Sequence, residues 1–408
     1  MYSTHDSTPL YNSWGSVPST QISESELANA LVENRFELSF QPKVSLLTGD
    51  VIGAEALVRL RRENGTLVLP DEFLPLAESS GVLGQLALKM LDKAVLAIGR
   101  IKQRHTGISI SMNVTPNDLE AHVVSWCIEK YLAHESIEPE DLQIEITESV
   151  AMSSVAEVQQ DIKNLNQLGI SVLMDDFGTG YSSIDRLSQL NFAALKLDKG
   201  VVQRMGTSTR NLDVVKSSIS MARDLRMTSV AEGVEDEGAY NFLMAYGCEE
   251  VQGFWVSRPL EIEQFEAFLD DHPDFSGSQI GRVHQALYNI IHYRKSLIDA
   301  AFCCTLNADT VLQTVFDSEV ALPADQSRFG LWYYGIGKRL EHTTGYTELE
   351  APFLSFHECG QRFMRQLGST RNSNAMLNTL IVEGDRYMDK IVVLLHQIER
   401  ELLLGGHG

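Results

Sequence analysis

Two adjacent aspartates, Asp175 and Asp176, end an apolar run that begins at Ile170 and lead directly into a segment containing two glycines, residues 177–180. Neighbouring carboxylates repel each other and lose hydration when they are clustered. A fold keeps such a pair together most readily when metal ions lie between the oxygens. The pattern therefore predicts a strand that ends in a binding site for divalent cations.

The same arrangement recurs along the first two thirds of the chain. Apolar runs end in a polar residue and are followed by a helical stretch at Glu55, Asn113, Glu145, Lys196 and Glu232. Oxygen ligands and a lysine collected from successive strand ends are typical of metal-dependent enzymes that cleave phosphate esters. Each residue alone is compatible with a solvated strand end, a turn or a helix cap, so the joint pattern carries the interpretation.

The periodicity of apolar residues predicts an α/β fold for this part of the chain. Strands are expected at residues 37–41, 53–58, 108–113, 142–146, 171–175, 194–197, 229–231 and 250–253. Helices are expected at residues 71–76, 82–100, 156–168, 211–225 and 237–245. Strands alternating with helices over such a length indicate a (β/α)₈ TIM barrel. An open doubly wound sheet is the alternative, but it concentrates functional residues at one switch point, whereas here they follow nearly every strand.

The rest of the chain has a different pattern. Residues 1–22 are rich in Ser, Thr, Tyr and Asn and are expected to form a disordered tail before a barrel at 23–272. Residues 273–281 have the composition of a linker. Helical periodicity then dominates at 282–302, 309–320, 329–340, 349–367 and 374–403. These segments predict that residues 282–408 form a small all-α, four-helix-type bundle.

Composition narrows the possible partners and location. The net charge of −22 argues against binding to a nucleic-acid polymer, which requires a basic surface. The cysteines are Cys127, Cys248, Cys303, Cys304 and Cys359, a scattered and odd-numbered set that does not suggest a disulfide framework. No signal peptide and no apolar run of membrane-spanning length is present in the sequence. We therefore expect a cytoplasmic protein without a membrane span.

Several motifs together resemble the EAL-domain cyclic-di-GMP phosphodiesterases over about residues 23–270. They are Gln41-Pro42-Lys43, Glu55-Ala56-Leu57-Val58-Arg59, Asn113, Glu145-Ile146-Thr147-Glu148, Asp175-Asp176-Phe177-Gly178-Thr179-Gly180, Lys196-Leu197-Asp198, Glu232-Gly233-Val234-Glu235 and Gln252-Gly253-Phe254. The resemblance implies a modified TIM barrel. It also implies Mg²⁺- or Mn²⁺-dependent hydrolysis of cyclic di-GMP to linear pGpG.

The resemblance further implies a role for each matching position. Glu55, Asn113, Glu145, Asp175 and Asp176 correspond to ligands of two Mg²⁺ or Mn²⁺ ions, with Asp175 bridging. Lys196 and Glu232 correspond to residues that handle the attacking water, and Glu148 to the anchor of the loop after the aspartate pair. Gln41, Leu57, Arg59 and Gln252 correspond to substrate contacts. Residues 177–188 correspond to a loop that contributes to a homodimer contact.

Two positions depart from the family pattern. Leu60 stands where many members have Trp, and Gly200 where Phe is common. Neither is a metal position, and every implied ligand is present, which favours a working enzyme. The alternative is a catalytically silent cyclic-di-GMP receptor that acts through protein–protein contacts.

The C-terminal segments 327–335 and 349–360 resemble the chemoreceptor zinc-binding family, a four-helix bundle that uses three His and one Cys. Here Ser327 stands in the Cys position and Phe353 in one His position. Only His357 matches cleanly, and the third His corresponds to His284 or His292. A closed zinc site needs four N or S ligands, so we expect no zinc in this bundle, which becomes a candidate regulatory module. Substitute ligands remain possible at Cys303, Cys304, His342 and Cys359.

Overall fold

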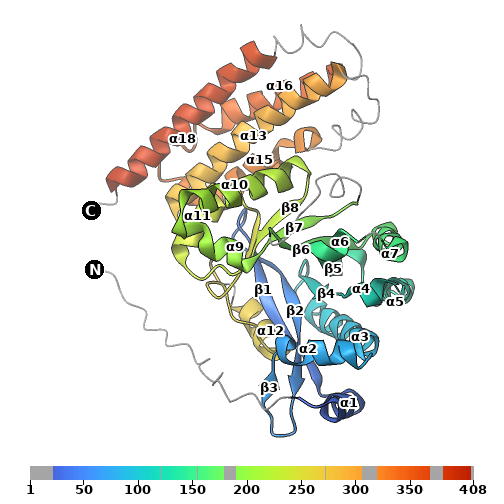
Figure 1. Ribbon diagram of the computed structural model, residues 1–408. Coiled ribbons are helices and arrows are strands. Elements are labelled where there is room, and N and C mark those ends of the chain that lie inside the picture. The colour runs from blue at the N-terminus through green and yellow to red at the C-terminus, as the bar shows by residue number, and fades with distance from the viewer. Residues whose placement is uncertain are drawn as a thin grey trace.

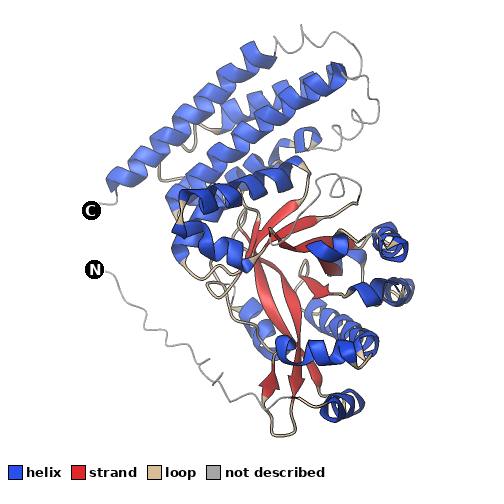
Figure 2. Ribbon diagram, in the orientation of Figure 1, coloured by secondary structure: helices blue, strands red, loops and turns tan. Residues whose placement is uncertain are grey.

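The computed structural model describes residues 22–120, 122–153, 155–178, 190–271, 273–305, 319–367 and 380–405. The predicted N-terminal tail, apart from residue 22, lies outside these residues. Within them, a barrel surrounded by helices is followed by a helical region (Figures 1 and 2). None of the described helices has the length and apolar character needed to cross a lipid bilayer.

Eight strands of a nine-stranded sheet close into the barrel, in the order β1-β9-β8-β7-β6-β5-β4-β2, with β1 pairing β2 to complete the ring. They are β1 (Phe36–Ser45), β2 (Val51–Arg61), β4 (Ser109–Asn113), β5 (Leu142–Thr147), β6 (Ser171–Phe177), β7 (Ala194–Leu197), β8 (Thr228–Ala231) and β9 (Glu250–Gln252). The short β3 (Leu67–Val68) pairs with the outer end of β2. The predicted TIM-type barrel and all of its expected strands are confirmed.

One strand runs against the others. β1 is antiparallel to both β2 and β9, whereas the remaining barrel pairs are parallel. The connection from β1 to β2 is a short turn that contains Gly49 with a φ of 83°. A parallel pair needs a crossover of a dozen or more residues, so this turn permits only a hairpin. The hairpin places Gln41 directly opposite Glu55.

The helices cover the outside of the barrel. They are α1 (Glu24–Val32), α2 (Pro70–Ser79), α3 (Leu83–Lys102), α4 (Pro116–Glu120), α5 (Val123–Ala133), α6 (Glu148–Ala151), α7 (Ala156–Gln167), α9 (Lys199–Arg204), α10 (Thr209–Asp224), α11 (Glu237–Ala245) and α12 (Ile262–Asp270). Alternate strand residues such as Ile110, Ile144 and Val172 belong to the large core cluster. Their neighbours face inward, because successive side chains of a strand point to opposite faces. The interior holds a small separate apolar cluster of Leu173, Ala194 and Val230 and is otherwise polar.

The helical region contains α13 (Gln279–Thr305), α15 (Arg328–Tyr334), α16 (Glu350–Leu367) and α18 (Asp385–Gly405), which pack around their own apolar core. The helix predicted at 329–340 is wrong as one element, because it breaks at Gly335 into α15 and the 3₁₀ turn Ile336–Leu340. A Cβ on Gly335 would lie 2.5 Å from the Leu331 carbonyl oxygen, so only glycine fits this break. Most of predicted segment 309–320, and residues 374–379, lie outside the described part.

The segment before α13 is packed against the barrel. The Tyr240 hydroxyl donates to the Phe275 carbonyl. The Ser278 amide donates to Asn241 Oδ1 at 2.8 Å. α13 then runs along α11, and Figure 1 shows the orange α13 between the green α11 and the red α18. A segment that looks like a free linker in the sequence is therefore fixed by side chains that come from α11.

Candidate active site

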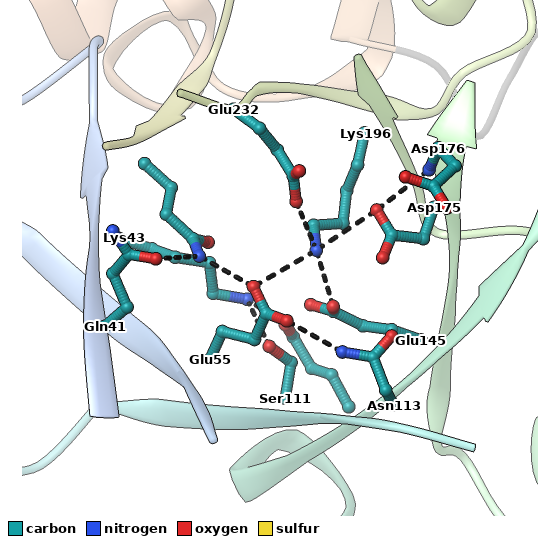
Figure 3. A network of polar contacts seen from close by, with 12 residues as sticks. Gln41, Lys43, Glu55, Ser111, Asn113, Glu145, Asp175, Asp176, Lys196 and Glu232 are labelled. Carbon is teal, nitrogen blue, oxygen red and sulfur yellow. Dashed lines mark hydrogen bonds and ion pairs between the residues drawn. The ribbon is translucent and has the colours of Figure 1, made fainter. Parts of the chain in front are cut away.

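The polar residues predicted at the strand ends meet at one mouth of the barrel (Figure 3). The members of this cluster are Gln41, Glu55, Asn113, Glu145, Asp175, Lys196, Glu232 and Gln252. They converge because the parallel strands end at the same rim. The antiparallel β1 adds Gln41 from the opposite chain direction. We call this group the carboxylate–lysine cluster.

Lys196 is the hub of the carboxylate–lysine cluster. Its Nζ lies 2.5 Å from Glu145 Oε2 and 2.6 Å from Glu232 Oε1. Glu55 Oε2 and Asp175 Oδ1 are slightly further away, at 3.4 Å and 3.3 Å. The Lys196 and Glu145 side chains are fully buried. One buried ammonium thus holds carboxylates that come from strands β2, β5 and β6 and from the segment after β8.

Glu55 is further held by amide side chains. Its Oε1 accepts from Asn113 Nδ2 at 2.7 Å, and its Oε2 accepts from Gln252 Nε2 at 2.6 Å. Gln252 also donates to Gln41 Oε1 at 3.0 Å. The two glutamines predicted as substrate contacts therefore also support a predicted metal ligand.

Asp176 has an unusual backbone. Its φ is 57°, a left-handed conformation that Asp tolerates better than most residues. Its amide donates to Asp175 Oδ1 at 2.9 Å. Two residues later, the Gly178 amide donates to Glu148 Oε2 at 3.2 Å, and Glu148 is buried. Glu148 thus contacts the beginning of the loop that it was predicted to anchor. Residues 179–188, which make up most of the predicted dimer loop, lie outside the described part.

The close packing of charges shifts the ionisation of the cluster. Burial opposes ionisation of Glu55, but Lys196 and the Gln252 hydrogen bond outweigh it and lower the pKa of Glu55. Burial, followed by repulsion from Glu55, raises the pKa of Glu145 to about 7. Burial raises the pKa of Glu232 to about 8, although Lys196 acts in the opposite direction. Neighbouring carboxylates that titrate so differently are typical of a functional site.

The same two effects, burial and neighbouring charge, shift the pKa values of Lys196 and of Asp176, which follows Asp175 in the sequence. Burial and then the charge of Asp175 raise the pKa of Asp176. Burial alone would lower the pKa of Lys196, but Glu145, Glu232 and the other carboxylates raise it well above its usual value. Lys196 therefore stays protonated at neutral pH.

A cavity of about 830 Å³ opens beside the cluster. Its lining includes the cluster residues Glu55, Asp175 and Glu232. The predicted substrate contacts Gln41, Leu57, Arg59 and Gln252 all line it as well. Leu60, one of the departures from the family pattern, does not line it and is fully buried in the core.

The cavity wall also contains residues that the sequence motifs did not assign to the site. The Phe254 ring is 42% exposed, with the Arg258 guanidinium 4.2 Å and the Lys199 ammonium 5.1 Å from its centroid. Phe254 is the last residue of the motif Gln252-Gly253-Phe254, and Lys199 directly follows Lys196-Leu197-Asp198. Their positions in the sequence could therefore have indicated both residues. Arg258 lies in a connection without periodicity, and nothing in the sequence marks it.

The donor chemistry of the carboxylate–lysine cluster fits divalent cations. Carboxylate and amide oxygens are the ligands that Mg²⁺ and Mn²⁺ prefer. The buried Glu145 Oε1 has no hydrogen-bond partner and remains available as a ligand. Within the described ranges, no three His, Cys, Asp or Glu side chains are arranged around one metal position. Their oxygens point instead to the Lys196 ammonium, which supplies positive charge at the centre of the cluster (Figure 3).

The fold and the site define a TIM-barrel protein whose acidic centre lies at the carboxyl ends of its strands. Residues 24–259, more than half of the chain, match the family model of the EAL domain, and the chain belongs to that family. This finding confirms the resemblance noted for the barrel.

Curated relatives of the barrel are named as cyclic di-GMP phosphodiesterases. The chain is 33% identical over 243 residues to the bifunctional diguanylate cyclase/cyclic di-GMP phosphodiesterase MucR of Pseudomonas aeruginosa, covering 59% of this chain and 36% of MucR. It is 31% identical over 243 residues to the cyclic di-GMP phosphodiesterase RocR of the same species, covering 60% of this chain and 62% of RocR. The chain thus spans less than two thirds of either relative.

A solved structure agrees with the sequence relatives. The PaMucR phosphodiesterase in complex with c-di-GMP matches with a TM-score of 0.56 and 34% identity, over 59% of this chain and 98% of that one. This structural match covers about the same share of the chain as the match to the EAL-domain model at residues 24–259.

Of the positions predicted from the zinc-binding resemblance, Phe353 and His357 contact each other, with 6.2 Å between ring centroids, but no described contact joins them to Ser327, His284 or His292. Ser327 Oγ donates to the Ala324 carbonyl at 2.7 Å and accepts from the Gly330 amide at 3.1 Å, capping α15. Phe353 packs against Phe329 at 4.7 Å between ring centroids. His357 is buried beside Tyr293. The candidates for the third His, His284 and His292, contact Glu399 and Tyr288 respectively.

Proposed function

We propose that this chain hydrolyses cyclic di-GMP to linear pGpG with two divalent cations, Mg²⁺ or Mn²⁺. The observation that carries the proposal is the convergence of Glu55, Glu145, Asp175 and Glu232 on Lys196 at the mouth of a large cavity in an EAL-family barrel. The names of MucR and RocR, both phosphodiesterases of this dinucleotide, support it.

The residues that would hold the cations are Glu55, Asn113, Glu145, Asp175 and Asp176, with Asp175 shared. When bound, a pair of such ions lowers the pKa of water and neutralises charge on the phosphate. Asp175 and Asp176 are suited to this because adjacent backbone positions present both carboxylates at one rim (Figure 3). Glu148 would keep them there by holding the Gly178 amide.

Lys196 and Glu232 would handle the attacking water. The Glu232 carboxylate accepts a proton from the water, and its pKa of about 8, raised by burial, suits a general base near neutral pH. The Lys196 ammonium, only 2.6 Å from Glu232 Oε1, orients the water and stabilises negative charge that develops on the phosphate. The water oxygen bonds to phosphorus as one phosphodiester bond to a ribose oxygen breaks, and that ribose oxygen keeps the bonding electron pair and takes up a proton from solvent.

The cavity offers chemistry that suits the substrate. Arg59, Lys199 and Arg258 provide positive charge for the phosphates of a cyclic dinucleotide. The exposed Phe254 ring provides a flat surface on which a guanine can stack. Gln41 and Gln252 provide polar contacts, and Leu57 an apolar one.

The test is chromatographic turnover of cyclic di-GMP by the full chain with Mg²⁺ or Mn²⁺. Glu55→Ala should lower the rate by orders of magnitude, because it removes a buried predicted ligand. Glu129→Ala, on an exposed position of α5, is the matched control and should leave the rate unchanged. Binding of cyclic di-GMP without any turnover by the wild type would instead favour the receptor function.

We also propose that the C-terminal helical region regulates the barrel. Arg328 at the start of α15 forms a close ion pair with Glu249, whose other oxygen accepts from the Ser229 amide of β8 at 3.1 Å. β8 leads to Glu232, and the strand after Glu249 leads to Gln252. A shift of α15 would therefore move β8 and β9, the strands that lead to Glu232 and Gln252.

The regulatory proposal predicts that Arg328→Ala changes turnover several-fold. Arg386→Ala, exposed on α18, is the control. Identical kcat and KM for Arg328→Ala and the wild type would contradict the proposed coupling. A homodimer and a cytoplasmic location stay predictions from the sequence, and light scattering of the purified chain tests the first.

A further inference from the structure

Lys43 is a buried lysine for which the proposed reaction has no role. It lies on β1 and is 1% exposed. Its Nζ donates to Gln143 Oε1 at 2.7 Å and to Ser111 Oγ at 3.2 Å. Among the ion pairs of the described residues, none includes Lys43. Burying an ammonium whose direct partners are all neutral is costly, so some nearby negative charge must offset the cost.

Burial raises the pKa of Glu250 on β9 and Lys43 acts against it, so Glu250 supplies part of that charge. The register of the strands shows where the rest lies. Gln143 precedes Glu145 by two residues on β5, and Ser111 precedes Asn113 by two on β4, so each pair faces the same side. Lys43 therefore lies one layer below the carboxylate–lysine cluster, inside the barrel (Figure 3).

The residue opposite Lys43 on β2 is Gly53. A Cβ on Gly53 would lie 2.4 Å from the Ser109 carbonyl oxygen, so β2 and β4 approach each other too closely there for a larger residue. The long Lys43 side chain reaches Ser111 on β4 and Gln143 on β5.

Lys43 changes the charge balance of the barrel interior. The cluster gathers the carboxylates of Glu55, Glu145, Asp175 and Glu232 around one central ammonium, Lys196. Without divalent cations, the negative charges exceed the positive charge of Lys196. Lys43 adds a second positive charge from below, where no solvent screens it.

We propose that Lys43 is a positioning residue whose ammonium is a fixed counter-charge that keeps the carboxylates of the cluster together when no divalent cation is bound. The inference rests on the proposed metal-dependent function. Lys43 contacts no reacting atom in this scheme. It acts by preserving the arrangement of Glu55 and Glu145 into which the cations bind.

The experiment compares melting temperatures in EDTA with those in MnCl₂ or MgCl₂, with no substrate present. In Lys43→Met, metal should raise the melting temperature by several degrees more than in the wild type, because cations replace the missing charge. Ser111→Ala removes a hydrogen bond to the same ammonium but no charge, so its metal-induced shift should equal that of the wild type. A purely structural role for Lys43 would lower both melting temperatures of Lys43→Met equally.

Gln143→Glu is a second variant that keeps the hydrogen bond to Lys43 and neutralises its charge. It should also show a larger metal-induced shift than the wild type. A shift equal to that of the wild type, or failure to fold even with Mn²⁺, overturns the proposal. If the wild type itself shows no metal-induced shift, the metal-dependent function falls with it, so the two failures are distinguishable.

Discussion

Lys196 Nζ lies 2.6 Å from Glu232 Oε1. Lys196 is on β7 and Glu232 just after β8, and these two strands are neighbours in the barrel. The contact joins the Lys196 ammonium, which stays protonated, to the Glu232 carboxyl, whose pKa burial raises to about 8. Such a pair can hold a water molecule and take its proton.

We expect Glu232→Gln to lower kcat by about 10²–10⁴-fold while the KM for cyclic di-GMP changes little. The amide oxygen can still accept from Lys196, so the variant should fold like the wild type, but it cannot take up a proton. Steady-state kinetics with Mn²⁺ check this. Glu237→Gln, exposed on α11, is the control. A Glu232→Gln protein that retains most of its kcat would exclude Glu232 as the base.

The strand-end residues could be predicted because their geometry is local. A polar residue that ends an apolar strand lies at the rim of the barrel, and closure of the barrel brings all such strand ends together at that rim. The pattern of the sequence is therefore sufficient to indicate Glu55, Glu145, Asp175 and Lys196, whereas the role of each comes only from the family resemblance.

Other features depend on contacts between distant residues and left no local signal. Lys43 belongs to a recognised motif, but nothing nearby in the sequence shows that β4 and β5 enclose its side chain. Residues 273–281 have the composition of a linker, yet α11 holds them. The Arg258 contribution to the cavity likewise depends on where the chain returns after β9.

Glu148→Ala should reduce kcat at least about tenfold, since a loosely held loop misplaces Asp175 and Asp176. Glu148 Oε2 accepts from the Gly178 amide, and an alanine leaves that amide without its acceptor. Glu148→Gln keeps an acceptor oxygen and should recover much of the activity. Kinetics at several Mn²⁺ concentrations test this, and unchanged rates at every concentration in Glu148→Ala would mean that the loop needs no such anchor.

The junction between the barrel and the helical region depends on one buried arginine. Arg282 donates to the carbonyls of Leu46 and Ser276, and Gln285 Nε2 adds a bond of 2.9 Å to the same Leu46 oxygen. Burial lowers the pKa of Arg282 to about 10, so it remains charged at neutral pH.

Arg282→Met should destabilise the protein by about 2–4 kcal/mol, because buried carbonyls lose their donors. Arg339 contacts the same segment through Asp274 and Ser276 but is half exposed. Arg339→Met should therefore cost no more than about 1 kcal/mol. Urea unfolding followed by fluorescence and circular dichroism measures both variants. Equal small losses would show that the junction is not held by Arg282.

The last prediction concerns zinc in the helical region, which we expect to be absent at stoichiometric level. Ser327 Oγ accepts from the Gly330 amide to cap α15 and donates to the Ala324 carbonyl of the preceding turn, and Phe353 fills its position with an aromatic ring among Phe329 and Tyr333. Packing of this kind replaces the folding energy that a structural zinc supplies. Elemental analysis of protein purified without added metal tests the prediction.

A double variant, Ser327→Cys with Phe353→His, offers the sharper comparison. It restores the two positions at which the chain departs from the zinc-binding family, of which Phe353 contacts His357. Zinc retained by the double variant but absent from the wild type would show that these two side chains decide metal binding. One tightly held zinc per wild-type chain would contradict the prediction and direct attention to the buried Cys359 as a replacement ligand.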